Sequence, residues 1–359
     1  MSGNEVIAEV KNLRTYFHVP EGVVRAVDGV DLVIKPGRTL GVVGESGCGK
    51  SVTALSLMRL VPSPGRIEGG EIIYYQSVRE TSASSLSDII DITRLKPNSR
   101  EIRAIRGNHI SMVFQEPMAA MLPVRTVGSQ IMEAITLHQN VSHQEARERA
   151  IEMLARVNLP NPDRIVDNYP FQLSGGMRQR AVIAMALSCN PHLLIADEPT
   201  TALDVTTEAQ ILDLMRKLQA DYNMAIMFIT HNLGVIAEMA DEVAVMYLGK
   251  VVEQTDIRSI FINPLHPYTQ ALLRSIPQLD DVMTRSGERR QLHTIKGMVP
   301  DPYTVLKGCP FHPRCPHFMS EVCDQVVPEV IEAEPDHIVR CHLYAPSPEE
   351  AQTRKEAML

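Results

Sequence analysis

The residues with the most specific chemistry form a glycine-rich run, GESGCGKS, at positions 44–51. It matches the pattern GxxxxGK[ST], in which backbone N–H groups surround phosphate oxygens at the start of a helix. Lys50 is expected to reach the β- and γ-phosphates of a nucleotide, and Ser51 to ligate Mg²⁺. The placement agrees, because an apolar strand pattern at 39–43 precedes the run and helical spacing at 51–60 follows it. The predicted nucleotide-binding residues here are Gly44, Ser46, Gly47, Cys48, Gly49, Lys50, Ser51 and Val52.

A second acidic site follows the apolar run LLIA at residues 193–196, which leads into Asp197 and Glu198. The run predicts a buried strand, and its carboxyl end should lie beside the phosphate loop, since ligands of open α/β sheets bind at that edge. Asp197 is the expected Mg²⁺ partner, directly or through water. Glu198 would orient and polarise the attacking water, because phosphoryl transfer depends mainly on in-line positioning and charge stabilisation.

The elements that must position these residues predict an α/β fold. Residues 193–196 and 225–229 are fully apolar strand patterns, each followed by polar residues, as in a parallel sheet covered by helices on both faces. Nearer the N-terminus, short strand patterns at 7–10, 24–27 and 30–34 predict a separate antiparallel sheet that leads into the core.

Differences in composition and hydrophobic pattern along the chain predict three parts. A nucleotide-binding domain over 1–260 includes a helical subdomain at about 116–180, where the pattern is amphipathic and rich in charge. A Pro-rich, Cys-containing segment over 261–346 predicts a small separate domain, and 347–359 a flexible tail. A polar, Ser-rich stretch at 76–99 predicts a surface insertion, to which we assign no function.

Composition and charge exclude several classes of function. The 359 residues carry a formal net charge of -8, so no basic face is expected for phosphate neutralisation, and nucleic acid is not an expected partner. The apolar runs stop far short of the roughly 18 to 20 residues of a membrane-spanning helix. The N-terminus lacks the pattern of a secretory signal. We therefore expect a cytoplasmic chain that serves a membrane only by docking to it.

The run LSGGMRQR at residues 173–180 resembles the signature of ABC ATPases, and it precedes Asp197 as that family requires. The run is expected to form a second helix N-terminus, where Ser174 and the backbone of Gly175 and Gly176 present donors to an anion. In the family this anion is the γ-phosphate of ATP bound to the other subunit. The resemblance implies an ABC-type P-loop NTPase core with ATP and Mg²⁺ as ligands, and two ATP molecules enclosed between two ATPase subunits.

Further residues resemble family motifs in the expected order. Gln115, in VFQEP, resembles the Q-loop glutamine, which contacts the metal or water and couples the site to the membrane subunits. Asp204, in TALD, resembles the D-loop aspartate, which communicates across the dimer. His231, in THN, resembles the switch histidine that holds the γ-phosphate. Tyr16 and Phe17 are candidates for the ring stacked on adenine; we favour Phe17, and a ring packed in a strand is the alternative.

The C-terminal segment carries the most specific resemblance. FINPLHPYT at 261–269 and GCPFHPRC at 308–315 are similar to the C-terminal domain of oligopeptide, dipeptide and nickel importer ATPases. The likeness to the ATPase itself covers about residues 6–254 with every catalytic motif intact, which implies a hydrolytically competent chain. One departure is MAAMLPV at 118–124, where close relatives more often carry a Thr-Ser-Leu-Asn-Pro type of sequence. In the family this stretch faces the membrane subunits, so the departure concerns coupling rather than catalysis.

Four cysteines form a set that favours metal binding over disulfides in a cytosolic chain. Zinc usually prefers close CxxC pairs, which are missing, whereas Cys-Pro pairs with wide, unequal spacing agree better with an iron–sulfur cluster. Members of the resembled family can carry a [4Fe–4S] cluster at such a set. We expect a cluster in a structural role, with zinc and unligated thiols as alternatives. The expected ligands are Cys309, Cys315, Cys323 and Cys341.

These features predict the ATP-hydrolysing subunit of an ABC-type importer of oligopeptides or dipeptides, bound at the cytoplasmic face of the cell membrane. The resemblance implies as partners two transmembrane permease subunits, a sister ATPase or a second copy of this chain, and an extracytoplasmic solute-binding protein. Nickel or another small solute is the alternative cargo. A soluble ABC ATPase is disfavoured, because such proteins usually hold two cassettes or a long coiled-coil insertion, and the complete catalytic set disfavours an iron–sulfur sensor.

Overall fold

A computed structural model describes most of the chain, namely residues 6–76, 89–115, 120–276 and 295–345. The predicted tail at 347–359 lies outside these residues, and so does half of the predicted Ser-rich insertion at 76–99, namely residues 77–88. The departure at 118–124 is described only from residue 120 onward.

Eight strands form the central sheet. They are β3 (Thr39–Val43), β6 (Ile110–Val113), β7 (Leu193–Asp197), β8 (Ala225–Thr230), β9 (Glu242–Tyr247), β10 (Lys250–Asp256), β11 (Ile331–Glu334) and β12 (His337–Val339). Their order across the sheet is β11-β12-β10-β9-β3-β8-β7-β6. The strands from β9 to β6 run parallel, whereas β10, β12 and β11 continue the sheet as antiparallel strands. The predicted parallel α/β core is confirmed.

A second, antiparallel sheet lies at the N-terminal side. It contains β1 (Ala8–Val19), β2 (Gly22–Ile34), β4 (Gly65–Tyr75) and β5 (Ile89–Asp91), in the order β2-β1-β4-β5. This confirms the predicted antiparallel sheet and corrects its strands, because the two short patterns at 24–27 and 30–34 belong to one strand. Leu13 pairs with Val30 and Arg14 with Asp28, so Gly29, at φ 80°, is the extra residue of a β-bulge.

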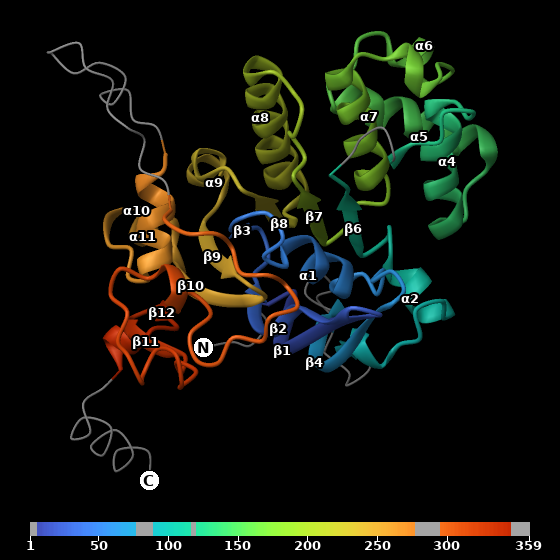
Figure 1. The fold of residues 1–359 in the computed structure, drawn as a ribbon. Helices are drawn as coiled ribbons and strands as arrows, with labels where there is room; N and C mark the ends of the chain where they lie inside the picture. Colours follow the sequence, from blue (N-terminus) through green and yellow to red (C-terminus); the bar gives the residue numbers. More distant parts are fainter. Residues whose placement is uncertain (1–5, 77–88, 116–119, 277–294, 346–359) are drawn as a thin grey trace, which may run out of the picture.

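Ten helices and four short 3₁₀ segments surround the sheets in the described part of the chain. The helices are α1 (Lys50–Leu57), α2 (Arg100–Ile105), α4 (Val127–His138), α5 (His143–Arg156), α6 (Pro162–Ile165), α7 (Gly175–Leu187), α8 (Val205–Tyr222), α9 (Leu233–Met239), α10 (Ile257–Ile262) and α11 (Pro267–Arg274). The 3₁₀ segments are η3 (Ile92–Arg94), η4 (Pro170–Gln172), η6 (His312–Arg314) and η7 (His342–Tyr344). Helices α4 to α7 gather at one end of the molecule, and α10, α11, β11 and β12 at the other (Figure 1). No helix of the described residues has the length and apolar character needed to cross a bilayer.

The parallel strands of the central sheet are buried on both faces, as their apolar sequences predict. In β8, Ile226 and Phe228 belong to a core shared with α7, α8, α9 and the helices at the far end. Met227 and Ile229 point to the opposite core, which is shared with α1 and the antiparallel sheet. Side chains of a strand alternate between the two faces of the sheet. Because a core covers each face, every residue of β8 is buried.

The C-terminal strands join the same sheet by pairing with β10, and a buried carboxylate lies at this junction. Glu253 of β10 pairs with Val339 of β12 and is fully buried. Its carboxylate accepts the backbone N–H groups of Leu265 (2.7 Å) and His266 (2.8 Å), and it lies 2.8 Å from Nε2 of His337. A buried polar group requires such partners. The sheet is therefore continuous across residue 260, and the domain limits at 1–260 and 261–346 stay a prediction.

Candidate functional site

The glycine-rich run forms a loop between β3 and α1. Gly49 has φ 105°, and a Cβ there would lie 2.1 Å from the carbonyl oxygen of Ala26. A Cβ on Gly44 would lie 2.2 Å from the carbonyl oxygen of Met246. Only glycine fits such close approaches of backbone to backbone. The loop thus leads directly into the N-terminus of α1, where backbone N–H groups favour anions.

Lys50 curls back over this loop. Its side chain is buried, and Nζ donates to the carbonyl oxygens of Gly44 (2.7 Å) and Glu45 (3.1 Å). The neighbouring Cys48 is also buried, with Sγ 3.8 Å from Nζ of Lys50. Burial raises the pKa of the Cys48 thiol, and the opposing effect of Lys50 is smaller. A protonated, buried thiol at this place acts as a small packed side chain.

Asp197 ends β7 with an unsatisfied oxygen. The residue is 4% exposed, and Oδ1 has no hydrogen-bond partner among the described residues. Burial raises the pKa of Asp197; the hydroxyl of Ser51 opposes this shift and the carboxylate of Glu198 adds to it. An unpaired buried carboxylate oxygen beside a hydroxyl offers the hard oxygen donors that Mg²⁺ prefers. Ser51 and Asp197 therefore fit the predicted metal.

Glu198 connects three of the predicted residues. It follows β7 with φ 46°, and its carboxylate lies 2.9 Å from Nδ1 of His231 through Oε1. Oε2 accepts hydrogen bonds from Nε2 of Gln115 (3.1 Å) and Oγ1 of Thr201 (3.0 Å). Burial alone would raise the pKa of Glu198, but the contacts with His231 and Thr201 outweigh it and hold the pKa below its usual value. The side chain is therefore an ionised hydrogen-bond acceptor.

Thr201 is the member of this cluster that the sequence analysis misses as a site residue. It stands three residues after Glu198, in the same turn, where its hydroxyl can reach back to the carboxylate. A hydroxyl residue at this spacing after a catalytic carboxylate is a signal that could have identified it. The structure brings Gln115 and His231 into contact with Glu198, and their predicted roles toward the nucleotide and the metal stay predictions.

The SGG run lies at the N-terminus of α7. Ser174 is exposed and is the N-cap of the helix, where its Oγ accepts the N–H of Met177 at 3.3 Å. Asp204 caps α8 in the same way, accepting from the N–H (2.9 Å) and hydroxyl (2.7 Å) of Thr207. A Cβ on Gly176 would lie 2.6 Å from Cγ2 of Thr207, so both helix starts pack against each other. No described contact joins Ser174 to Lys50 within the chain.

The two candidate aromatic residues have different surroundings. The hydroxyl of Tyr16 donates to Asp28 at 2.7 Å, and burial together with this carboxylate raises the pKa of Tyr16 to about 12. Phe17 stands beside Val24 and Gly65 on the neighbouring strands, and a Cβ on Gly65 would lie 2.6 Å from its ring. The ring of Phe17 thus packs over a glycine. Its predicted contact with adenine stays a prediction.

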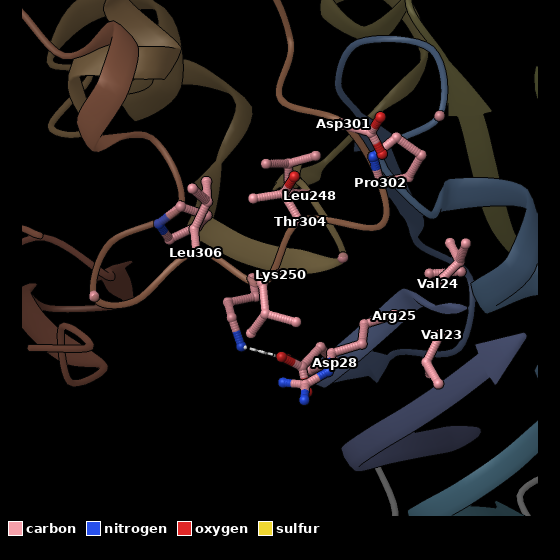
Figure 2. Close-up of a pocket in the computed structure, with 16 residues that line it drawn as sticks. Val23, Val24, Arg25, Asp28, Leu248, Lys250, Asp301, Pro302, Thr304 and Leu306 are labelled. Atoms are coloured by element: carbon pink, nitrogen blue, oxygen red, sulfur yellow. Dashed lines mark hydrogen bonds and ion pairs between the residues drawn. The ribbon is translucent and has the colours of Figure 1, made fainter. Parts of the chain in front are cut away.

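A cavity of about 120 Å³ lies between β2, the phosphate loop and the C-terminal segment at 301–310 (Figure 2). Gly47 lines it from the loop and Thr304 from the C-terminal segment. At its lower edge Lys250 pairs with Asp28 at 2.8 Å. Phe17 lies outside its lining. The C-terminal segment therefore forms part of the wall next to the phosphate loop.

The four predicted cluster cysteines lie in one neighbourhood without forming a metal site. Cys309, Cys323 and Cys341 are buried and Cys315 is half-buried. Burial, with smaller contributions from the neighbouring thiols, raises the pKa of Cys309 to about 12 and of Cys341 to about 11. Across the described residues, no three His, Cys, Asp or Glu side chains are arranged to hold a metal ion. The predicted [4Fe–4S] cluster is not supported by this geometry.

Two family models match the chain, "ABC transporter" over residues 27–201 and "Oligopeptide/dipeptide transporter, C-terminal region" over residues 252–323. A putative peptide import ATP-binding protein of Brucella melitensis is 50% identical to it, with 93% of this chain and 96% of the relative covered. The oligopeptide transport ATP-binding protein AppD of Bacillus subtilis is 48% identical, with 94% and 97% covered.

A solved structure shows the same fold. The dimeric ATP-binding cassette MJ0796, in a post-hydrolysis state bound to ADP and Pi, matches with a TM-score of 0.59 and 28% identity, covering 70% of this chain and 99% of that one. The match shows that the strands and helices of this chain are arranged as in that ATP-binding cassette. The chain belongs to the ATP-binding subunits of ABC transporters, in the group that carries the oligopeptide/dipeptide transporter C-terminal region.

Proposed function

We propose that this ABC ATPase hydrolyses ATP to drive the import of oligopeptides or dipeptides across the cytoplasmic membrane. The cluster of Gln115, Glu198 and His231 at the ends of β6, β7 and β8 carries the catalytic part of the proposal. The names of the relatives, which are peptide import and oligopeptide transport proteins, support the cargo.

In this proposal the loop from Gly44 to Val52 binds the phosphates, and Lys50 turns its ammonium group from the loop carbonyls toward them. Mg²⁺, when bound, would supply positive charge to neutralise the phosphates, and Ser51, Asp197 and Gln115 are the residues that would hold it. Glu198 accepts a hydrogen bond from the attacking water and orients it in line with the γ-phosphate. The lowered pKa of Glu198 keeps this acceptor ionised at neutral pH.

His231 and Thr201 orient the Glu198 carboxylate in this proposal, and His231 also holds the γ-phosphate. Phe17 stacks on adenine. Ser174, Gly175, Gly176 and Asp204 act on the ATP of a second ATPase subunit. The exposed position of Ser174 supports this, because an exposed helix N-terminus is accessible to an anion held by a partner. The dimeric MJ0796 cassette supports a paired arrangement.

The remaining partners follow from transport. We propose that the ATPase pair, formed by two copies or by this chain and a sister subunit, docks peripherally on two transmembrane permease subunits at the cytoplasmic face. An extracytoplasmic solute-binding protein delivers the cargo. Nickel or another small solute is the second candidate cargo, because nickel importers carry a similar C-terminal domain.

Uptake in cells tests this proposal. Deleting the gene should abolish uptake of a radiolabelled tripeptide, and plasmid-borne wild type should restore it while Glu198→Gln should not. Radiolabelled nickel is measured in the same strains. Loss of nickel uptake with unchanged peptide uptake would replace the peptide cargo by the metal, and unchanged uptake of both would refute the import role.

The cysteine set is tested separately. Iron and acid-labile sulfide are measured in protein purified without oxygen. Negligible iron would agree with the absence of a metal-holding group among the described side chains. Stoichiometric iron and sulfide, lost in Cys323→Ser, would restore the predicted [4Fe–4S] cluster.

A further inference from the structure

Glu45, the second residue of the phosphate loop, has all of its polar groups engaged. Its carbonyl oxygen accepts from Nζ of Lys50 (3.1 Å) and from the N–H of Cys48 (3.3 Å). Its own N–H donates to the hydroxyl of Tyr268 at 2.9 Å. Its carboxylate accepts two hydrogen bonds from Arg314, at 2.7 and 3.1 Å. The two contacts of the carbonyl oxygen come from the loop, and the other three come from Tyr268 and Arg314 in the C-terminal region.

The Arg314 side chain is buried and held by several contacts. It is 4% exposed, compared with 25% for the carboxylate of Glu45. Its Nε donates to the carbonyl oxygen of Lys296 (3.2 Å), and its guanidinium carbon lies 5.9 Å from the ring centre of Tyr247. A guanidinium that is fixed by stacking and by a third acceptor holds a carboxylate in one orientation. Lysine could not make this bidentate contact, because its ammonium group lacks the planar fork of donors.

Tyr268 holds the loop from the other side. It is fully buried in α11, and its ring lies 4.6 Å from that of Tyr247 and 5.4 Å from that of Phe311, centre to centre. Phe311 directly precedes η6, which carries Arg314. One aromatic cluster thus supports both contacts to Glu45. The cluster is rigid because its members are packed on all sides.

The position of Glu45 makes these contacts relevant to nucleotide binding. Backbone N–H groups bind phosphate well only when they are held in place beforehand, and Glu45 follows Gly44 at the start of the loop. The carboxylate of Glu45 is also an anion beside a site for an anionic ligand. Unless a cation neutralises it, it repels a triphosphate.

We propose that Arg314 is a positioning residue for ATP binding, which neutralises Glu45 and, with Tyr268, fixes the phosphate loop to the C-terminal region. The proposal rests on the phosphate-binding role of the Lys50 loop. It assigns to the C-terminal region a direct part in nucleotide affinity, through a side chain that touches the loop and not the nucleotide.

The test compares Arg314→Gln with the double variant Glu45→Gln/Arg314→Gln. In Arg314→Gln the carboxylate is left without its cation, so KM for MgATP should rise about tenfold or more, with a smaller change in kcat. In the double variant the unpaired charge is gone, and KM should return to within about threefold of wild type. Arg274→Gln, an exposed arginine at the end of α11, is the matched control and should keep the wild-type KM.

Arg314→Gln with an unchanged KM would overturn the proposal, and so would a double variant that binds ATP as poorly as the single one. A purely structural role would lower the melting temperature and the active fraction in both variants without a rescue of KM. If Arg314→Gln does not fold, Tyr268→Phe replaces it; loss of the acceptor for the Glu45 N–H should also raise KM, and an unchanged KM would count against the proposal.

Failure of this inference is distinguishable from failure of the proposed function. Wild-type protein that hydrolyses ATP and takes part in uptake upholds the function, whatever the KM of Arg314→Gln. Wild-type protein without ATPase activity would refute the function and the inference together.

Discussion

Oε1 of Glu198 lies 2.9 Å from Nδ1 of His231, two residues that are 33 positions apart in the sequence. Each follows one of two adjacent parallel strands, β7 and β8, so both side chains emerge at the same edge of the sheet. Gln115, which follows β6, reaches the other carboxylate oxygen. Three neighbouring strand ends thus present one hydrogen-bonded carboxylate next to the phosphate loop.

This relationship predicts that Glu198→Gln binds ATP but does not turn it over. Glutamine keeps the size of the side chain and loses the charged acceptor for water, so kcat should fall by at least about a hundredfold, the usual effect of removing a general base. ATPase assays and titration with a fluorescent ATP analogue measure the two quantities. Glu152→Gln, an exposed carboxylate on α5, is the control. Rapid multiple turnover by Glu198→Gln would contradict the assigned role.

Lys50→Ala should have the opposite defect, a loss of binding. The Nζ group of Lys50 is the cation of the loop, and its two contacts with the carbonyls of Gly44 and Glu45 would be exchanged for contacts with phosphate oxygens. We expect affinity for MgATP to fall by at least about a hundredfold, as when a buried charge partner is removed. The same titration measures it, with Lys217→Ala on the exposed face of α8 as control. Near-normal affinity would remove Lys50 from the site.

Some of this structure could be predicted because the signal is local. The runs at 193–197 and 225–230 are strands buried on both faces, and such strands have continuous apolar sequences. The phosphate loop is equally local, because its glycines are required by close backbone approaches within one turn. The bulge at Gly29 was not predictable from periodicity, since the extra residue interrupts the alternation and resembles the end of a strand.

Other parts depend on contacts that no local pattern encodes. Glu45 and Arg314 are 269 residues apart, and their pairing requires the C-terminal region to return to the phosphate loop. Likewise, the spacing of the four cysteines indicates a ligand set, but spacing does not determine how the sulfur atoms converge. Helix α1 ends at Leu57, earlier than its apolar spacing indicates, and Arg59 nearby adopts a left-handed φ of 52°.

Acid should destabilise the junction between α11 and β10 through His266. Its imidazole is fully buried, and Nδ1 accepts the N–H of Tyr268 at 3.0 Å, so the ring is neutral with its hydrogen on Nε2. Burial lowers the pKa of His266 from 6.5 to about 4, against a smaller opposing effect of Glu253. The unfolded chain therefore binds the proton more readily than the folded one. Stability should fall as the pH decreases from 6.5 to 4, by about 3 kcal/mol for this group.

His266→Asn tests this prediction, because asparagine can accept the Tyr268 N–H at the helix start and does not titrate. Urea unfolding is followed at several pH values between 4 and 7. The variant should lose less stability than wild type over this range. His143→Asn, an exposed histidine at the start of α5, should behave as wild type. Equal slopes for wild type and His266→Asn would show that the buried ring does not control the acid sensitivity.

Ser174→Arg should prevent pairing of two ATPase subunits while leaving ATP binding to the single chain intact. Ser174 is exposed at the N-terminus of α7, and the proposed dimer brings this tip to the ATP of the partner. A long side chain there would block the approach. In Glu198→Gln protein, where ATP is retained, light scattering should detect an ATP-dependent dimer, and adding Ser174→Arg should leave monomers.

Loss of the helix cap alone would cost about 1 kcal/mol of stability, and the control must separate this from blocked pairing. Ser142→Arg removes the equivalent cap of α5, where Oγ of Ser142 accepts the N–H of Glu145 at 3.2 Å. In the Glu198→Gln background this control should still dimerise with ATP. If Ser174→Arg dimerises as well as the Ser142→Arg control, Ser174 does not lie between the subunits, and the assignment of the SGG run to the partner's nucleotide is wrong.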